Sequence, residues 1–102
     1  MIDLVEQNRN AVVELCRKYR VKTLEVFGSA ADGTFDPERS DLDFLVDFLP
    51  MDPGPHAKSY FGVWFGLRDL FDRNVDLVET AAVSNPYFLE AIEPHRMTVY
   101  AA

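Results

Sequence analysis

Short β-type runs alternate with helical stretches along the whole of this 102-residue chain, and this alternation restricts the possible folds more than any other feature. The β-type runs are rich in branched and aromatic residues and cover 23–27, 42–48 and 75–78, with an edge-type run at 97–100. Apolar residues at helical spacing predict helices over 3–19, 57–72 and 86–92. Asn85 suits the cap of the last helix, and Pro86 suits its first position.

This order of elements predicts an α/β (α+β) fold in which a small mixed β-sheet is flanked by helices. Between the first two strands, residues 29–40 are rich in short polar residues and predict a loop with one helical turn at its start. Hydrophobic residues make up 48% of the chain, which is enough for a core. The length suits one compact domain, so we expect residues 1–102 to form a single domain.

The charge of the chain excludes some classes of partner. With 10 Lys and Arg against 17 Asp and Glu, the formal net charge is −7, which disfavours direct binding to nucleic acid or to an anionic membrane surface. No stretch approaches the length of a membrane span. The single cysteine, Cys16, has no internal partner for a disulfide, so we expect a reducing, cytoplasmic compartment.

Acidic residues interrupt two of the predicted strands. Asp41 and Asp43 are two residues apart, so in an extended chain both carboxylates emerge on the same side. Asp76 lies inside the third apolar run, and a neighbouring strand can place it beside the other two. Converging carboxylates are costly unless a cation neutralises them, and hard oxygen ligands of this kind suit Mg²⁺.

Gly28 and Ser29 directly follow the first strand and suggest a phosphate-binding turn. Glycine lets a phosphate approach the backbone closely, while exposed amides and a serine hydroxyl supply donors. Taken singly, an Asp-x-Asp is most often a solvated strand face, and a Gly-Ser pair is most often just a loop. Their occurrence in this order, with Asp76 on a later strand, favours a triphosphate site beside a metal site.

The same order of motifs resembles the minimal nucleotidyltransferases (MNT) of the DNA polymerase β-like superfamily, which carry G-S, then D-x-D, then a later strand Asp. The resemblance rests on Gly28-Ser29, on Asp41-Leu42-Asp43 and on Asp76, and runs over nearly the whole chain. It implies the nucleotidyltransferase fold. It also implies that Asp41, Asp43 and Asp76 bind two Mg²⁺ ions and catalyse the transfer, and that Gly28 and Ser29 bind the triphosphate of ATP.

The chain departs from the family pattern at two points. Eleven residues separate Ser29 from Asp41, where the family has about ten, so the loop has absorbed an insertion. After Gly-Ser the family often places arginine, as in G-S-R-A-R-G, whereas this chain has Ala30-Ala31-Asp32-Gly33. The nearest substitute positive charge is Arg39, which is either a phosphate ligand or a solvated loop residue.

Stand-alone members of this family imply a partner. They are antitoxins paired with HEPN-domain ribonuclease toxins, and they transfer AMP from ATP to a tyrosine of the toxin. We therefore expect a Mg²⁺-dependent protein adenylyltransferase that acts as an antitoxin. Two alternatives stay open: an antitoxin that neutralises its partner by binding alone, and a nucleotidyltransferase acting on a small molecule such as an aminoglycoside.

Five further side chains allow more than one interpretation. Phe61 and Phe65 exceed what one buried helix face needs; core packing is favoured, and a docking patch is the alternative. His56 and His95 each lie beside proline without metal-ligand spacing, so we interpret both as surface residues. We expect Cys16 to be a small buried hydrophobic residue rather than a nucleophile.

Overall fold

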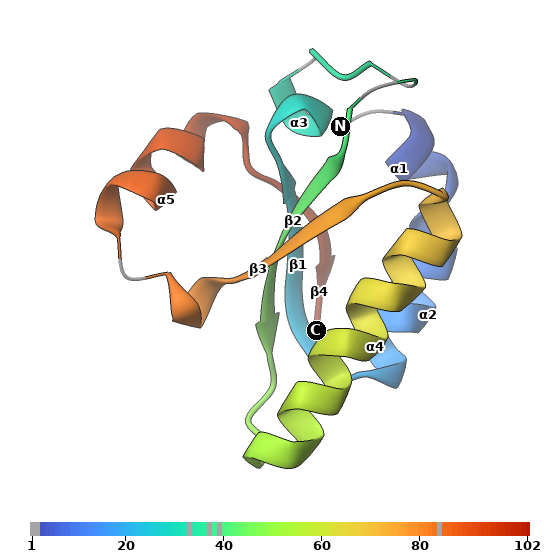
Figure 1. Cartoon of the computed structure of the whole chain (residues 1–102), viewed down its shortest axis with the longest axis vertical. Helices are drawn as coiled ribbons and strands as arrows, with labels where there is room; N and C mark the ends of the chain where they lie inside the picture. The colour runs from blue at the N-terminus through green and yellow to red at the C-terminus, as the bar shows by residue number, and fades with distance from the viewer. Residues whose placement is uncertain (1–2, 33, 37, 39, 84) are drawn as a thin grey trace.

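The computed structural model describes residues 3–32, 34–36, 38, 40–83 and 85–102, which form a mixed sheet with helices on both faces (Figure 1). The elements in chain order are α1 (Asp3–Gln7), α2 (Arg9–Lys18), β1 (Val21–Phe27), α3 (Ser29–Asp32), β2 (Leu42–Phe48), α4 (Pro53–Phe71), β3 (Val75–Glu79), η1 (Thr80–Ala82), α5 (Pro86–Ile92), η2 (Glu93–His95) and β4 (Met97–Ala101). Both η1 and η2 are single turns of 3-10 helix.

Among the described residues, four strands form the sheet in the order β3-β2-β1-β4. β1 is antiparallel to β2 and to β4, whereas β2 and β3 run parallel. A parallel pair needs a crossover connection, which α4 supplies between β2 and β3. The prediction of a small mixed sheet flanked by helices is confirmed, and β4 is an edge strand as expected.

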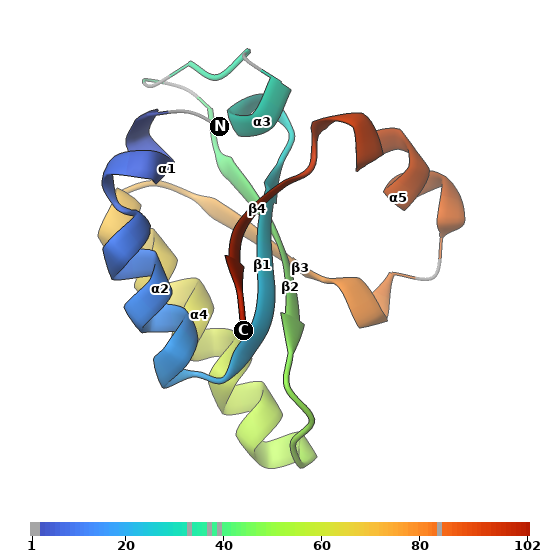
Figure 2. The ribbon, with the colours of Figure 1, turned by 180° about the vertical axis from the view of Figure 1, so that it is seen from behind.

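The helices divide between the two faces of the sheet (Figures 1 and 2). α2 and α4 cover one face, where apolar side chains from both helices meet alternate residues of the strands. The fully buried members of this core include Val12, Cys16, Leu24, Val26, Leu42, Phe44, Val46, Val63 and Leu67. α5 lies on the opposite side, so the second face of the sheet is covered less completely.

The predicted helix over residues 3–19 is wrong as a single element, because Asn8 divides it into α1 and α2. The Asn8 side-chain amide donates a hydrogen bond to the Leu4 carbonyl at 2.8 Å, and its backbone leaves helical geometry at φ −105° and ψ 12°. An asparagine that bonds to nearby backbone in this way competes with the helix. The break lets Val5 and Val12 both reach the core.

α4 begins at Pro53, four residues before its predicted start at Ala57. Pro53 and Pro55 both lie in the first helical turn, where backbone N–H groups have no intrahelical acceptor. Proline is therefore tolerated there, although the same residues suggest a turn when the sequence is read alone. Trp64 and Tyr60 of α4 then donate to the Val75 and Leu77 carbonyls of β3 at 2.8 and 2.6 Å.

The preferred interpretation of Phe61 and Phe65 as core residues is wrong. Their exposed fractions are 52% and 53%, and they lie one turn apart on the outer side of α4. The opposite side of this helix packs closely on α2, where an added Cβ at Gly62 would collide with the Tyr19 ring. Because the inner face is filled in this way, the two phenylalanines are left at the surface.

The remaining sequence-based interpretations of single residues agree with the structure, with one addition. Cys16 is fully buried, and burial raises the pKa of its thiol to about 12, so it does not act as a nucleophile. His95 is exposed, whereas His56 is only partly exposed and shares a hydrogen bond with Glu79 at 2.9 Å. None of the helices in the described part of the chain is long and apolar enough to cross a membrane.

Candidate functional site

The candidate residues gather at the end of the sheet where β1 finishes and where β2 and β3 begin. β1 runs antiparallel to β2, so Phe27, its last residue, pairs with Asp43 near the start of β2. β3 runs parallel to β2, and Asp76 is the register partner of Asp43. Three segments that lie far apart in the sequence are thus brought to one end of the molecule by strand pairing.

Asp43 and Asp76 form a close carboxyl pair on the less covered face of the sheet. Asp43 is half-buried, whereas Asp76 is exposed. Burial of Asp43, its hydrogen bond with Asp76 and the negative charges of Asp76 and Asp41 raise the pKa of Asp43 from 3.8 to about 6. Such a pair favours a proton or a cation between its oxygens.

Asp41 takes a different position from the other two acids. It precedes β2, is exposed, and lines a separate polar pocket of about 420 Å³. The other lining residues of that pocket are Glu38, Ser40, Arg68, Asp72, Arg73 and Asn74. The structure therefore brings Asp43 and Asp76 together and leaves Asp41 beside them, near enough for its charge to act on Asp43.

Gly28 lies directly against the Asp43 carboxylate. Its φ of +68° falls in the left-handed region, and a Cβ built on it would collide with the Asp43 Oδ2 atom. Ser29 follows as the first residue of α3, and the Ala31 amide donates to the Gly28 carbonyl at 3.0 Å. Glycine is therefore needed at position 28 so that the turn can pass close to the carboxyl pair.

Position 30, where the family often has arginine after the Gly-Ser pair, is buried in this chain. Ala30 is buried, with an exposed fraction of 1%, and belongs to the hydrophobic core. An arginine at this position would have to bury its charge, which is costly without a partner. Arg39, the proposed substitute, lies outside the described residues.

The donor set fits a divalent cation. Within the described part of the chain, no group of three or more His, Cys, Asp or Glu side chains is arranged to hold a metal ion by itself. Mg²⁺ is usually bound by one or two carboxylates together with substrate phosphates, and two repelling carboxylates at one point supply the protein's share. Asp43 and Asp76 are therefore the residues that would hold the ion.

A pocket of about 420 Å³ adjoins the carboxyl pair, and most of its walls are apolar. It is lined by Phe27, Asp43, Tyr60, Trp64, Val75, Asp76, Leu77, Val78 and Phe88. Phe27 and Phe88 were not predicted from the sequence to belong to the site. Phe27 pairs with Asp43 across the two strands, so their side chains lie on the same face of the sheet. The rings of Phe27 and Phe88 meet edge to face, with centroids 5.8 Å apart.

The raised pKa of Asp43 predicts how stability changes with pH in the absence of divalent cations. The folded protein binds this proton more tightly than the unfolded chain, so the Asp43 contribution to stability falls as pH rises from about 4 to about 6 and stays low above that. We expect Asp43→Asn to raise the free energy of unfolding at pH 7.5 by about 1 kcal/mol, because solvent screens a half-buried carboxylate.

Urea unfolding in EDTA at pH 4 and pH 7.5 measures this effect. The gain from Asp43→Asn should be present at pH 7.5 and nearly absent at pH 4. Asp47→Asn serves as the control, because Asp47 lies on the same strand and the same face four residues further along. An equal gain at both pH values would contradict the electrostatic origin.

Comparison with known proteins gives three kinds of match. A family model described as a nucleotidyltransferase domain matches residues 9–99. A protein of Methanocaldococcus jannaschii, assigned by name as a protein adenylyltransferase, is 35% identical over 91 residues, which cover 89% of this chain and 86% of that protein. Solved structures also share the fold of this chain.

A crystal structure of a toxin-antitoxin with AMP-PNP superposes with a TM-score of 0.70 at 21% identity, covering 93% of this chain and 74% of the matched chain. A structure of a tri-AMPylated Shewanella oneidensis HEPN toxin in complex with an MNT antitoxin gives a TM-score of 0.65 at 17% identity, covering 96% and 73%. The expected fold is confirmed by these similarities.

Proposed function

Because the chain belongs to the nucleotidyltransferase domain family, we propose that it transfers AMP from ATP to a protein hydroxyl. The observation that carries this proposal is the Asp43–Asp76 carboxyl pair, which lies against Gly28 and beside a pocket large enough for a small ligand. The M. jannaschii relative is named as a protein adenylyltransferase, and this name supports the proposal that the acceptor is a protein.

We further propose that the acceptor is a tyrosine of a HEPN ribonuclease toxin and that this chain is its antitoxin. Similarity to the complex of a tri-AMPylated HEPN toxin with an MNT antitoxin supports that choice of partner. The net charge of −7 also suits a partner that binds RNA through a basic surface, because opposite charges steer association.

In this transfer, the acceptor oxygen forms a bond to the α-phosphorus of ATP. The bond from that phosphorus to the oxygen of the β-phosphate breaks, and pyrophosphate leaves with the bonding electron pair. When bound, Mg²⁺ lowers the pKa of the acceptor hydroxyl and neutralises charge on the phosphates. Asp43 and Asp76 would hold the ion, and the exposed Asp41 would complete the protein ligands.

The chain's own residues bind and orient the reactants. Asp76, which is exposed at the edge of the carboxyl pair, accepts a hydrogen bond from the acceptor hydroxyl and directs its oxygen toward the α-phosphorus. As the new bond forms, the Asp76 carboxylate takes up the hydroxyl proton. The Gly28-Ser29 turn supplies a backbone close enough for phosphate contact and a hydroxyl donor for the triphosphate. Correct positioning and charge stabilisation are the main requirements of phosphoryl chemistry.

Incubation of the purified protein with α-labelled ATP, Mg²⁺ and the candidate HEPN protein tests the function. Label on the toxin, and its absence when the toxin's acceptor tyrosine is replaced by phenylalanine, would support the proposal. Tight binding with no label would favour an antitoxin that acts by binding alone. Transfer to an aminoglycoside but to no protein would favour the small-molecule alternative.

Phe61 and Phe65 predict where the partner docks. Exposed aromatic side chains are enriched in protein interfaces, and these two lie together on one face of α4. Replacing both with serine should weaken toxin binding about tenfold or more, since each buried aromatic contributes on the order of 1 kcal/mol or more. ATP binding should be unchanged, because neither residue lines the pocket beside the carboxyl pair.

Calorimetric titration of the double variant against the toxin and against ATP measures both effects. Asp69→Asn is the control, because Asp69 is an exposed residue of the same helix. It shows whether any substitution on the surface of α4 weakens toxin binding. Unchanged toxin affinity in the double variant would show that α4 is not the docking surface.

A further inference from the structure

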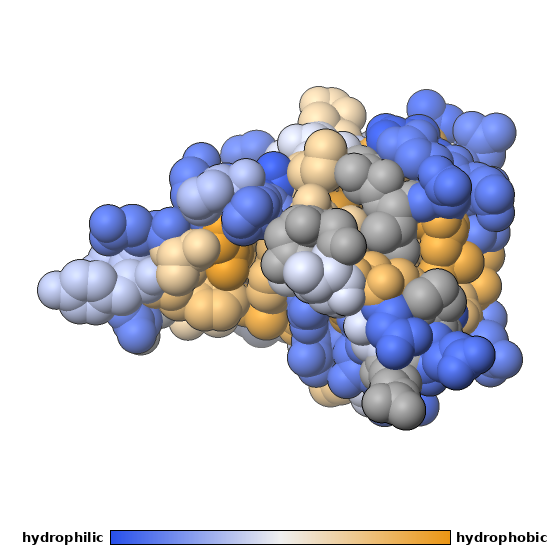
Figure 3. Space-filling view, turned by 90° about the horizontal axis from the view of Figure 1, so that it is seen from above, coloured by the Kyte–Doolittle hydropathy of each residue, from blue (hydrophilic) through white to orange (hydrophobic). Residues whose placement is uncertain are grey.

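A second apolar hollow lies next to the carboxyl pocket, between β3 and α5. It has a volume of about 340 Å³ and is lined by Val78, Val83, Asn85 and Phe88. Val78 and Phe88 also line the pocket that contains Asp43 and Asp76, so the two spaces share a wall. Seen from above, hydrophobic residues gather where α5 meets the rest of the molecule (Figure 3).

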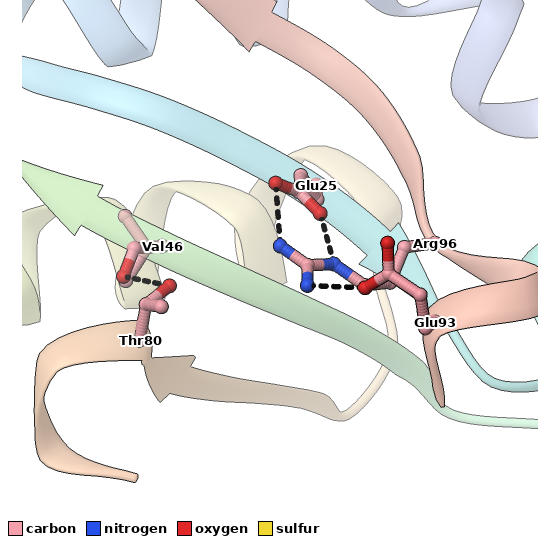
Figure 4. Close-up of polar contacts among 5 residues, drawn as sticks. All are labelled: Glu25, Val46, Thr80, Glu93 and Arg96. Atoms are coloured by element: carbon pink, nitrogen blue, oxygen red, sulfur yellow. Dashed lines mark hydrogen bonds and ion pairs between the residues drawn. The ribbon is translucent and has the colours of Figure 1, made fainter. Parts of the chain in front are cut away.

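The segment that contains α5 is attached to the sheet both before and after the helix (Figure 4). At the first end, the Thr80 hydroxyl of η1 donates to the Val46 carbonyl of β2 at 3.4 Å. At the other end, the Arg96 guanidinium donates to both Glu25 carboxylate oxygens, at 2.6 and 3.0 Å, and to Glu93 at 2.8 Å.

Between these two anchors, the ring contact of Phe88 with Phe27 holds the middle of α5 against the sheet. Thr80 thus joins the segment to β2, whereas Phe88 and Arg96 join it to β1. The hollow is therefore already formed in the protein without ligand.

The order of groups across the strands indicates which part of a nucleotide reaches the hollow. Gly28 follows β1, Asp43 lies on β2, and Asp76 lies on β3, so the three stand in that order across the sheet. In ATP, the α-phosphate lies between the terminal phosphates and the nucleoside. With the terminal phosphates at Gly28 and the α-phosphate at the carboxyl pair, the nucleoside extends toward β3 and α5.

The lining of the hollow suits the flat ring of a nucleobase, and the base of ATP is a purine. Val78, Val83 and the Phe88 ring provide apolar surface for a flat heterocycle, and aromatic stacking accepts any base. The Asn85 side-chain oxygen is already engaged by the Tyr87 amide at 2.9 Å. Its amide nitrogen is the group that can donate to a ring nitrogen of the base.

We propose that this hollow, walled by β3 and α5, seats the purine base of ATP and that Phe88 is the stacking residue. The inference rests on the proposed nucleotidyl transfer and adds to it the site that distinguishes ATP from inorganic phosphates. Phe88 and Val83 are accordingly binding residues, with no role in the bond-making step.

Binding of ATP and of inorganic tripolyphosphate to Phe88→Ala tests the assignment. Stacking of a base on an aromatic side chain contributes roughly a tenfold to hundredfold change in affinity. We expect Phe88→Ala to weaken ATP binding by that factor in the presence of Mg²⁺ while tripolyphosphate, which has no base, binds as it does to wild type. Tyr87→Ala is the matched control, because Tyr87 is the adjacent residue of α5 and is 76% exposed.

A second variant, which blocks the hollow with a larger side chain, controls for a loss of folding caused by removal of the Phe88 ring. Val83→Trp should occupy the hollow, exclude ATP and spare tripolyphosphate, with an unchanged circular dichroism spectrum. Equal loss of both ligands in the two variants would overturn the assignment, and so would unchanged ATP affinity accompanied by a raised KM for the protein acceptor. If wild type binds neither ligand, the proposed function itself fails.

Discussion

Asp43→Asn is expected to reduce AMP transfer at least about a thousandfold while the protein remains folded. The stabilisation that a bound cation gives to the transferring phosphates is worth several kcal/mol, and each 1.4 kcal/mol is a factor of ten in rate. Asparagine is nearly the same size as aspartate but lacks the charge that holds the cation. The raised pKa of Asp43 means that its removal relieves repulsion in the unliganded protein.

Initial rates of label transfer from α-labelled ATP, measured for wild type and Asp43→Asn at equal concentration, give the size of the effect. Asp47→Asn, on the same face of β2, should retain wild-type transfer and controls for loss of a negative charge alone. The same large loss is expected for Asp76→Asn, since Asp76 is the register partner of Asp43. Transfer at the wild-type rate by Asp43→Asn would remove the carboxyl pair from the mechanism.

Gly28→Ala is expected to produce the second large effect, a loss of activity together with a loss of stability. A left-handed φ of +68° costs a residue with a side chain about 1–2 kcal/mol. The new Cβ would also collide with the Asp43 carboxylate, and that side chain has to move away from its position beside Asp76. A displacement of a catalytic group by about 1 Å can cost a hundredfold in rate.

Urea unfolding and label transfer on Gly28→Ala separate these two consequences. Gly54→Ala is the matched control, because a Cβ added at Gly54 would meet nothing within 4 Å apart from the adjoining residues and the backbone of its own helix. Alanine there should leave transfer unchanged and stabilise the protein by up to about 1 kcal/mol, since it favours the helix over glycine. Full activity in Gly28→Ala would show that close approach of the turn to Asp43 is not required.

Local signals in the sequence were sufficient for several elements. β2 occupies the predicted residues 42–48, because a run of apolar β-formers ends there at proline-containing turn residues. The start of α5 at Pro86 follows from the Asn85 cap, whose side chain accepts the Tyr87 amide in the structure. The short helix at Ser29 was also expected. These features depend on backbone preferences that act within a few residues.

The order of Gly28-Ser29, Asp-x-Asp and Asp76 along the chain likewise pointed to the nucleotidyltransferase family before any tertiary contact was known. A motif that spans separate strands can be recognised in this way because each part keeps its local setting. Which acids meet in space was not available from that order. Strand register places Asp43 opposite Asp76, while Asp41, only two residues away, precedes β2, lies beside the pair and lines another pocket.

Three further features were decided by tertiary structure alone. The division of residues 3–19 at Asn8 lets both helical parts reach the core. The spacing of apolar residues along the sequence does not reveal this break. Phe61 and Phe65 are exposed because the opposite face of α4 packs closely on α2, and the choice of buried face depends on that neighbour. The hollow at Phe88 exists because Arg96 and Thr80 hold α5 beside the sheet. The sequence by itself determined the local elements and the chemistry-bearing residues, whereas long-range packing and strand register decided which of them meet.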